Sequence, residues 1–186
     1  MAETGIAVAA ARLDMVAKLN AQAQEMETPF PRPDLNLGGF VEDGLASGAS
    51  AVQVEQDFYD ALNASIHGDR ENGKTSIGPH RSDIEALHTT KNMPAGLCST
   101  GEQKALLIGM VLAHALLLES EKRRAPVLLL DDIAAHLDEH RRTALFEFIQ
   151  TTVMQCWMTE TEVDAFSSLK DKALFAQVRD NQVITA

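Results

Sequence analysis

Apolar residues return at helical spacing in several stretches of the chain. In residues 3–27 they recur every third or fourth position, with charged and amide side chains between them, which is typical of an amphipathic helix. Pro29, Pro31 and Pro33 end this helix and force an extended segment after it, because proline cannot continue a helix. The same spacing predicts helices over four further stretches, residues 51–66, 102–122, 139–152 and 162–170.

Continuous apolar runs in the second half of the chain predict a different kind of element. Residues 126–130 and 153–158 are too short for stable helices and carry few polar side chains, as strands buried inside parallel sheets do. Because predicted helices alternate with these strands, the pattern from residue 126 onward favours an α/β architecture. Weaker strand patterns stand at residues 74–77, 83–87, 174–178 and 182–184, the last two joined by a turn at Asp180 and Asn181.

Charge and composition narrow the class of protein. The 186-residue chain carries 16 Lys and Arg against 27 Asp and Glu, a formal net charge of −11, so it lacks the basic footprint of a protein that simply wraps nucleic acid. Its 45% of apolar residues is enough for a packed core. No uninterrupted apolar run approaches the ~20 residues of a membrane span, and the 2 cysteines do not make a disulfide framework. We therefore expect a reduced, cytoplasmic protein that does not act at a membrane.

Residues 68–75, GDRENGKT, fit the phosphate-loop pattern G-x-x-x-x-G-K-[ST] letter for letter. Such a loop binds phosphate when it runs from a buried strand into the N-terminus of a helix. Here a predicted helix comes before it, and Gly78 and Pro79 follow too soon for a helix to form after it. We expect a polar connection at this position, with a stand-alone phosphate-loop enzyme as the alternative.

Two carboxylates follow the apolar run at residues 126–130. Asp131 and Asp132 stand at the predicted carboxyl end of a parallel strand, where open α/β sheets bind their ligands. One carboxylate there can hold a Mg²⁺ ion that bridges nucleotide phosphates, and the other can orient or deprotonate an attacking water. Taken alone, the segment fits equally well a strand that ends in an aspartate helix cap.

A second polar cluster opens the long helix predicted over residues 102–122. Ser99 and Glu102 have the spacing of a capping box, which is a purely structural role. The same helix N-terminus, with the small residue Gly101, would also present bare N–H groups to an anion. The cluster taken alone leaves both roles open.

The order of these motifs is more specific than any one of them. Residues 99–103 (STGEQ), a long helix, the strand that ends at Asp131 and Asp132, and residues 135–138 (AHLD) form one ordered constellation. It resembles the carboxyl-terminal half of an ABC-type ATPase head, where these are the signature motif, Walker B and the D-loop. Within that superfamily the chain is most similar to the RecF family, through residues 77–83 (IGPHRSD), 99–104 (STGEQK) and 128–142 (LLLDDIAAHLDEHRR).

The resemblance implies a fold and a division of the chain. Residues 73–186 would form the carboxyl-terminal half of the head, a mostly parallel sheet with flanking helices. Residues 1–72 would belong to a second, helical or mixed lobe that is inserted into the head. RecF-like chains place their phosphate loop (Walker A) in the amino-terminal half, so we expect this chain to be a fragment that is inactive as an ATPase by itself.

The resemblance also implies roles for the residues around the strand end. Asp131 would bind Mg²⁺, and Asp132 would take the catalytic position that many ABC proteins fill with glutamate. Asp138 would contribute to the ATP site by organising the dimer interface near the attacking water. The histidine that such proteins carry after the following strand is replaced here by Thr159.

At the signature, the resemblance implies contacts with ATP that is held by the opposite head of a dimer. Ser99, Thr100 and Gly101 would touch its γ-phosphate through the helix N-terminus, and Gln103 belongs to the same binding set. Thr100 and Glu102 replace the Gly and Gln of the common signature, with Gln103 one place later. Glu102 therefore puts a negative charge where phosphate is expected.

For the whole protein, the resemblance implies ATP-dependent DNA binding in recombinational repair and replication restart. Two heads would form a homodimer that hydrolyses ATP between them, binds gapped DNA or junctions of single- and double-stranded DNA, and helps other Rec-pathway proteins load the recombinase. One alternative is another ABC-type head of the SMC or Rad50 class, although residues 1–66 show no sustained heptads. Another is a non-catalytic interaction module, which the fragment would be in isolation.

Overall fold

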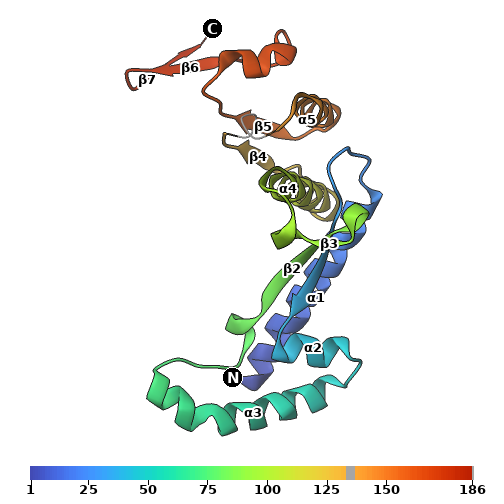
Figure 1. Ribbon diagram of the computed structural model, residues 1–186, viewed down its shortest axis with the longest axis vertical. Coiled ribbons are helices and arrows are strands. Elements are labelled where there is room, and N and C mark those ends of the chain that lie inside the picture. The colour runs from blue at the N-terminus through green and yellow to red at the C-terminus, as the bar shows by residue number, and fades with distance from the viewer. Residues whose placement is uncertain (133–136, 186) are drawn as a thin grey trace. The chain divides into compact units, whose positions relative to one another are not determined.

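The computed structural model describes residues 1–132 and 137–185, and the chain divides into two compact units. The first unit is Met1–Glu121 and the second is Lys122–Ala186. Figure 1 labels their helices and strands. The boundary predicted between residues 72 and 73 concerns a complete head and stays a prediction; in the structure that position is the end of a helix.

The first unit begins with three helices, of which apolar spacing predicts the first and the third; the short second helix lies in a glycine-containing stretch for which strand edges and turns, or a loop, are the prediction. These are α1 (Ala2–Glu25), α2 (Phe40–Ala46) and α3 (Ala51–Asn72). Helix α3 begins at a side-chain cap, because the Ser50 hydroxyl accepts from the Gln53 N–H, and it runs six residues past the predicted end. Gly73 ends it in the left-handed conformation with φ of 64°, which favours glycine.

An antiparallel sheet follows the order β1-β2-β3, with β1 (Pro33–Gly38), β2 (Asp83–His88) and the short β3 (Met93–Pro94). The strand predicted over residues 74–77 is wrong, because these residues form a turn beyond α3. Asp69 holds that turn: its backbone carbonyl accepts from the Lys74 N–H at 3.3 Å and its side chain accepts from the Ser76 N–H at 3.0 Å. The backbone donors that a strand would need are therefore used locally.

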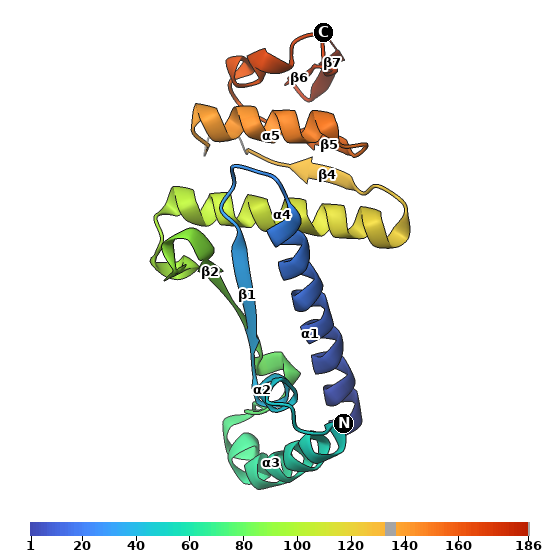
Figure 2. The ribbon, with the colours of Figure 1, turned by 90° about the vertical axis from the view of Figure 1, so that its right-hand side faces the viewer.

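The core of the first unit forms at two places along one face of α1. Near its N-terminus Ala2 and Ala9 pack with residues of α2 and α3, and Gly5 lets the helix approach Phe58 so closely that a Cβ at Gly5 would lie 2.5 Å from the ring. Further along, Val16 packs against β1, and Figure 2 shows α1 and β1 side by side. Asn20 fixes this pairing, since its side-chain amide both donates to the Leu35 carbonyl and accepts from the Leu35 N–H, each at 2.8 Å.

Short 3₁₀ helices stand before β2, between β2 and β3, and between β3 and α4 (Thr100–Lys122), and α4 confirms the predicted long helix. They are η1 (Pro79–Arg81), η2 (Thr89–Lys91) and η3 (Ala95–Leu97). By length and composition α4 is the one described helix that could cross a membrane, a test that core helices of soluble proteins also pass. One side of α4 is buried along its length, at Ala105, Leu106, Ile108, Gly109, Leu112, Ala113, Ala115 and Leu117.

The second unit contains the parallel strand pair predicted for an α/β fold. Strand β4 (Val127–Leu130) pairs with β5 (Gln155–Met158), and α5 (Glu139–Thr151) lies between them in sequence, as in a β-α-β unit. The predicted hairpin is present as β6 (Ala176–Arg179) and β7 (Gln182–Thr185), turned by Asp180 and Asn181 at φ of 49° and 60°. The helix predicted over residues 162–170 is the 3₁₀ helix η5 (Val163–Leu169).

Burial of the parallel pair differs from the prediction. Leu128 and Leu130 are buried, but Leu129 and its register partner Trp157 are 74% and 62% exposed. Side chains alternate between the two faces of the β4–β5 sheet, and only one of these faces is buried. The continuous apolar run predicts that both faces are buried. The open face is therefore apolar at Leu129 and Trp157.

Candidate nucleotide-binding elements

The N-terminus of α4 is built around the Glu102 carboxylate. Its Oε2 accepts from the Ser99 backbone N–H at 3.0 Å and from the Ser99 hydroxyl at 2.9 Å. The first of these bonds is the reach-back bond of a capping box, so the structural alternative for this pair is realised. In this arrangement the Ser99 hydroxyl faces a carboxylate of its own helix.

A lysine from outside the helix neutralises Glu102. Lys91, the last residue of η2, forms an ion pair with Glu102 Oε1. This ammonium, followed by the two Ser99 donors, lowers the pKa of Glu102 to about 2, so the carboxylate is ionised at neutral pH. The negative charge that departs from the common signature is therefore balanced within the first unit, by a residue 11 positions upstream that no local pattern in the sequence marks.

The remaining predicted signature residues differ in their roles. The Gln103 side chain donates to the carbonyl oxygens of Cys98 at 3.1 Å and Gly96 at 3.4 Å, so it ties the loop before α4 to the helix. Thr100 is exposed. An added Cβ at Gly101 would meet nothing within 4 Å, so the space beside this first turn is open. Gly101 and Thr100 are the positions where another molecule could approach the helix N-terminus.

Asp131 and Asp132, the residues predicted at the strand end, are both exposed, and both form a hydrogen bond with Thr159. Thr159, the residue after β5, donates its hydroxyl to Asp131 Oδ1. The same hydroxyl oxygen accepts from the Asp132 backbone N–H at 3.2 Å. The Thr159 backbone N–H donates to the Leu130 carbonyl at 3.0 Å, so the threonine is fixed to the end of β4 by its main chain as well.

Asp138 has a local structural role in the second unit. It is the N-cap of α5, where its Oδ1 accepts from the Arg141 N–H at 2.8 Å and its Oδ2 lies 3.4 Å from Arg141 Nη1. The neighbouring residues of the predicted D-loop, 135 and 136, lie outside the described residues. The part that Asp138 would take in an ATP site stays a prediction.

Oxygen donors suited to Mg²⁺ are present at the end of β4, although not a complete cage. Among the described residues no three His, Cys, Asp or Glu side chains form a metal-binding group. Asp131 and Asp132 are both exposed. One or two carboxylates are what a Mg²⁺ ion takes from a protein when phosphates and water supply its other ligands. The residues therefore fit a metal that arrives with a nucleotide.

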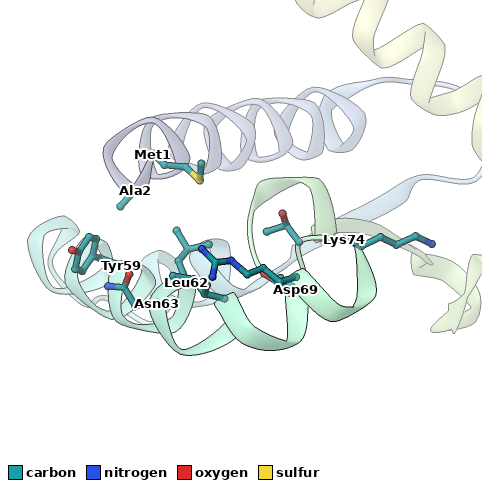
Figure 3. Close-up of a pocket in the computed structure, with 11 residues that line it drawn as sticks. Met1, Ala2, Tyr59, Leu62, Asn63, Asp69 and Lys74 are labelled. Carbon is teal, nitrogen blue, oxygen red and sulfur yellow. The ribbon is translucent and has the colours of Figure 1, made fainter.

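The phosphate-loop pattern at residues 68–75 does not form a phosphate loop. Its first five residues are the last turns of α3, and Gly73 caps that helix at its C-terminus. The carboxyl end of a helix repels phosphate, since its dipole is negative there. An open hollow of about 530 Å³ beside this helix end is lined by Asp69 and Lys74 and by the apolar side chains of Leu62 and Ile66. Figure 3 labels Asp69, Lys74 and Leu62 among the lining residues.

The stretch IGPHRSD at residues 77–83 connects elements of the first unit. The buried Glu42 of α2 accepts from the Ser82 hydroxyl at 2.6 Å, and Arg12 of α1 donates to the Pro79 carbonyl. Gly78 has φ of 138°, a conformation that side chains rarely adopt. This motif therefore has a structural explanation in the chain itself.

The chain is similar to known proteins in both sequence and fold. No family model matches the chain. It is 49% identical over 180 residues to the DNA replication and repair protein RecF of Mesorhizobium japonicum, a match that covers 96% of this chain and 47% of that protein. With RecF of Allorhizobium ampelinum it shares 46% identity over 185 residues, covering 98% of this chain and 49% of the relative. The chain is thus similar to RecF proteins over nearly its whole length.

The chain spans about half the length of the RecF proteins it matches. That share agrees with the carboxyl-terminal portion predicted from the motif order. A solved structure of the recombination mediator protein RecF-ATP matches 100% of this chain and 49% of that chain, with a TM-score of 0.76 at 20% identity. A structure from work on ATP-driven dimerisation of SMC ATPases matches 96% of this chain and 89% of that chain, with a TM-score of 0.54 at 17% identity. These two likenesses establish the fold, an α/β fold of the RecF and SMC head type.

Proposed function

We propose that this chain is the carboxyl-terminal portion of a RecF-like, ATP-dependent DNA-binding protein of recombinational repair and replication restart. The observation that carries the proposal is the order of STGEQ, a long helix, Asp131-Asp132 and Asp138 on a RecF-type fold, in a chain 49% identical to a RecF protein. ATP would be hydrolysed between two heads of a homodimer. The protein would work in the cytoplasm, at gapped DNA, with other Rec-pathway proteins.

In this proposal Asp131 and Asp132 divide the work at the strand end. Asp131 holds Mg²⁺, which when bound offsets the negative charge of the nucleotide phosphates. Asp132 accepts a hydrogen bond from the attacking water and orients it, or takes up its proton. Both carboxylates are exposed, so a nucleotide held by the phosphate loop of the same head could reach them.

The N-terminus of α4 supplies the second half of the proposed site. The backbone N–H groups of its first turn, at Thr100 and Gly101, would donate to the γ-phosphate of ATP that the opposite head holds. The open space beside Gly101 supports this approach. The Ser99 hydroxyl, which donates to Glu102, would have to rotate toward the phosphate to join the site. Because Lys91 balances the charge of Glu102, the carboxylate repels the phosphate less.

The proposal is tested by adding the part of a RecF protein that this chain does not match. The purified chain is mixed with the unmatched remaining part of M. japonicum RecF, and ATP hydrolysis is measured with and without gapped DNA. We expect hydrolysis by the mixture and none by the chain alone. Lys74→Ala is the control for the alternative of a stand-alone phosphate-loop enzyme: it should leave ATP binding by the mixture unchanged, since Lys74 follows a helix end.

A non-catalytic module is the second candidate for the chain in isolation. It is favoured by one observation, that the chain's phosphate-loop pattern is helical and cannot hold a nucleotide. Thermal unfolding separates the two cases. A module shows the same unfolding temperature with and without Mg²⁺ and ATP, both alone and in the mixture, whereas the ATPase proposal predicts an increase in the mixture.

A further inference from the structure

Thr159 is the described residue whose side chain touches both carboxylate residues of the proposed site. We infer that Thr159 is a positioning residue, which orients the Asp131 carboxylate toward a metal ion and holds the backbone of Asp132. The inference rests on the proposed function and adds to it a third residue, from a different strand. It assigns a role at the position where ABC-type heads carry a histidine.

The main chain places the threonine at this point. Met158, the last residue of β5, is the register partner of Leu130, the last residue of β4. The Thr159 N–H then donates to the Leu130 carbonyl, which extends the pairing one step beyond the strands. Asp131 and Thr159 are thus both the first residues after paired strand ends, so their side chains meet although they stand 28 positions apart.

A hydroxyl group suits the position because it donates and accepts at once. Its one hydrogen goes to Asp131 Oδ1, and a lone pair of its oxygen accepts from the Asp132 N–H. A carboxylate with one oxygen fixed offers the other in a narrower range of directions, so less orientation is lost when a cation binds. A donor that contacts a metal ligand in this way commonly changes metal affinity by about 10- to 100-fold.

The bond to the Asp132 N–H holds an uncommon backbone conformation. Asp132 has φ of 48°, in the left-handed region where residues other than glycine are rare. Structures keep such residues where surrounding contacts fix them, often at functional sites. Without the threonine oxygen this N–H loses a partner and Asp132 can relax to a commoner conformation, which would move its carboxylate.

The inference is tested in the mixture of this chain with the remaining part of M. japonicum RecF. Thr159→Val keeps the shape and removes the hydroxyl, while Thr159→Ser keeps the hydroxyl. We expect Thr159→Val to raise the Mg²⁺ concentration that half-saturates ATP binding by about 10-fold and to lower kcat by a similar factor, and Thr159→Ser to recover most of both losses. Thr151→Val is the matched control, because its hydroxyl donates only to the Phe148 carbonyl in α5 among the described contacts.

Folding is followed separately on the chain alone. Trp157 is the single tryptophan and lies two residues before Thr159, so its fluorescence reports unfolding of this strand pair. If Thr159→Val does not fold, Thr159→Ala takes its place. A Mg²⁺ dependence of Thr159→Val equal to that of the parent overturns the inference. If Asp131→Asn and Asp132→Asn also keep the parental Mg²⁺ dependence and kcat, the proposed function is contradicted as well. If these two variants lose activity while Thr159→Val does not, only the inference about Thr159 is contradicted.

Discussion

The N-terminus of α4 and the carboxyl end of β4 carry the two halves of the proposed chemistry, and they are held in different ways. At α4, the Glu102 carboxylate binds Ser99 three residues before it and Lys91, so it is fixed within a short stretch of chain. At β4, the Asp131 carboxylate is held by Thr159 from the next strand. The first arrangement joins residues that are close in sequence, and the second exists only once β4 and β5 have paired.

This difference predicts that the two regions respond differently to the same kind of change. Local contacts at α4 keep their geometry even where another molecule binds. At β4 the Thr159 hydroxyl holds the Asp131 carboxylate and the Asp132 backbone N–H, so a small change at Thr159 should alter function before it alters folding.

Gly101→Val should lower the affinity of the reconstituted protein for ATP by at least about 10-fold, because a branched side chain would occupy the space that a phosphate needs. The fold of the chain should keep its stability, since an added Cβ meets nothing within 4 Å and valine is a better helix former than glycine. Gly96→Val is the matched control, with similarly open space. Calorimetry measures ATP affinity and thermal unfolding measures stability. Equal ATP affinity of the Gly101→Val and Gly96→Val variants would contradict phosphate binding at the N-terminus of α4.

Asp138→Ala should lower the free energy of unfolding by about 1 kcal/mol, because it removes the side-chain cap of α5. Asp138→Asn should lower the free energy of unfolding by less than about half of that amount, since asparagine caps a helix equally well. Urea unfolding of the chain followed by Trp157 fluorescence measures the change in the second unit. Equal losses in both variants would mean that the carboxylate charge, rather than the cap, stabilises the helix.

Acid should weaken the α4 arrangement through Glu102. Its folded-state pKa is lowered from the ordinary 4.5 to about 2, so the stabilisation is complete above about 4.5 and is lost as the pH falls toward 2. The free energy of unfolding of the parent should therefore fall more steeply between pH 4.5 and pH 2 than that of Glu102→Gln. Lys91→Ala should move the pKa of Glu102 upward, measurable by NMR titration, and an unchanged pKa would exclude Lys91 as its main cause.

The sequence predicts what is local and misses what depends on distant contacts. Spacing of apolar residues places α1, α3, α4 and α5, and the turn residues Asp180 and Asn181 mark the hairpin correctly. The strand expected at residues 74–77 fails because Asp69 binds the donors of that segment. The phosphate-loop pattern at residues 68–75 begins inside a helix. The apolar spacing predicts that this helix ends at residue 66, but in the structure it continues to Asn72.

The candidate site shows the same division. Ser99 with Glu102, and Asp131 with Asp132, could be named from the sequence because each pair lies within four residues. The contacts of Lys91 and Thr159 could not, since an ion pair over 11 positions and a hydrogen bond over 28 positions depend on the fold. The exposed apolar face of Leu129 and Trp157 likewise differs from a prediction that assumes cover on both sides of the strands.

The most direct test of a RecF-like ATPase is the rate of ATP hydrolysis by the chain mixed with the remaining part of M. japonicum RecF, compared between the parent and Asp132→Asn. The proposed role predicts hydrolysis by the parent mixture, a loss of about 100-fold or more in kcat for Asp132→Asn, and ATP binding retained in both. Asparagine keeps the size and the backbone of the residue while removing its capacity to take up a proton. Hydrolysis by the Asp132→Asn mixture at the parental rate would contradict the role of Asp132, and a parent mixture that neither binds nor hydrolyses ATP would contradict the proposed function.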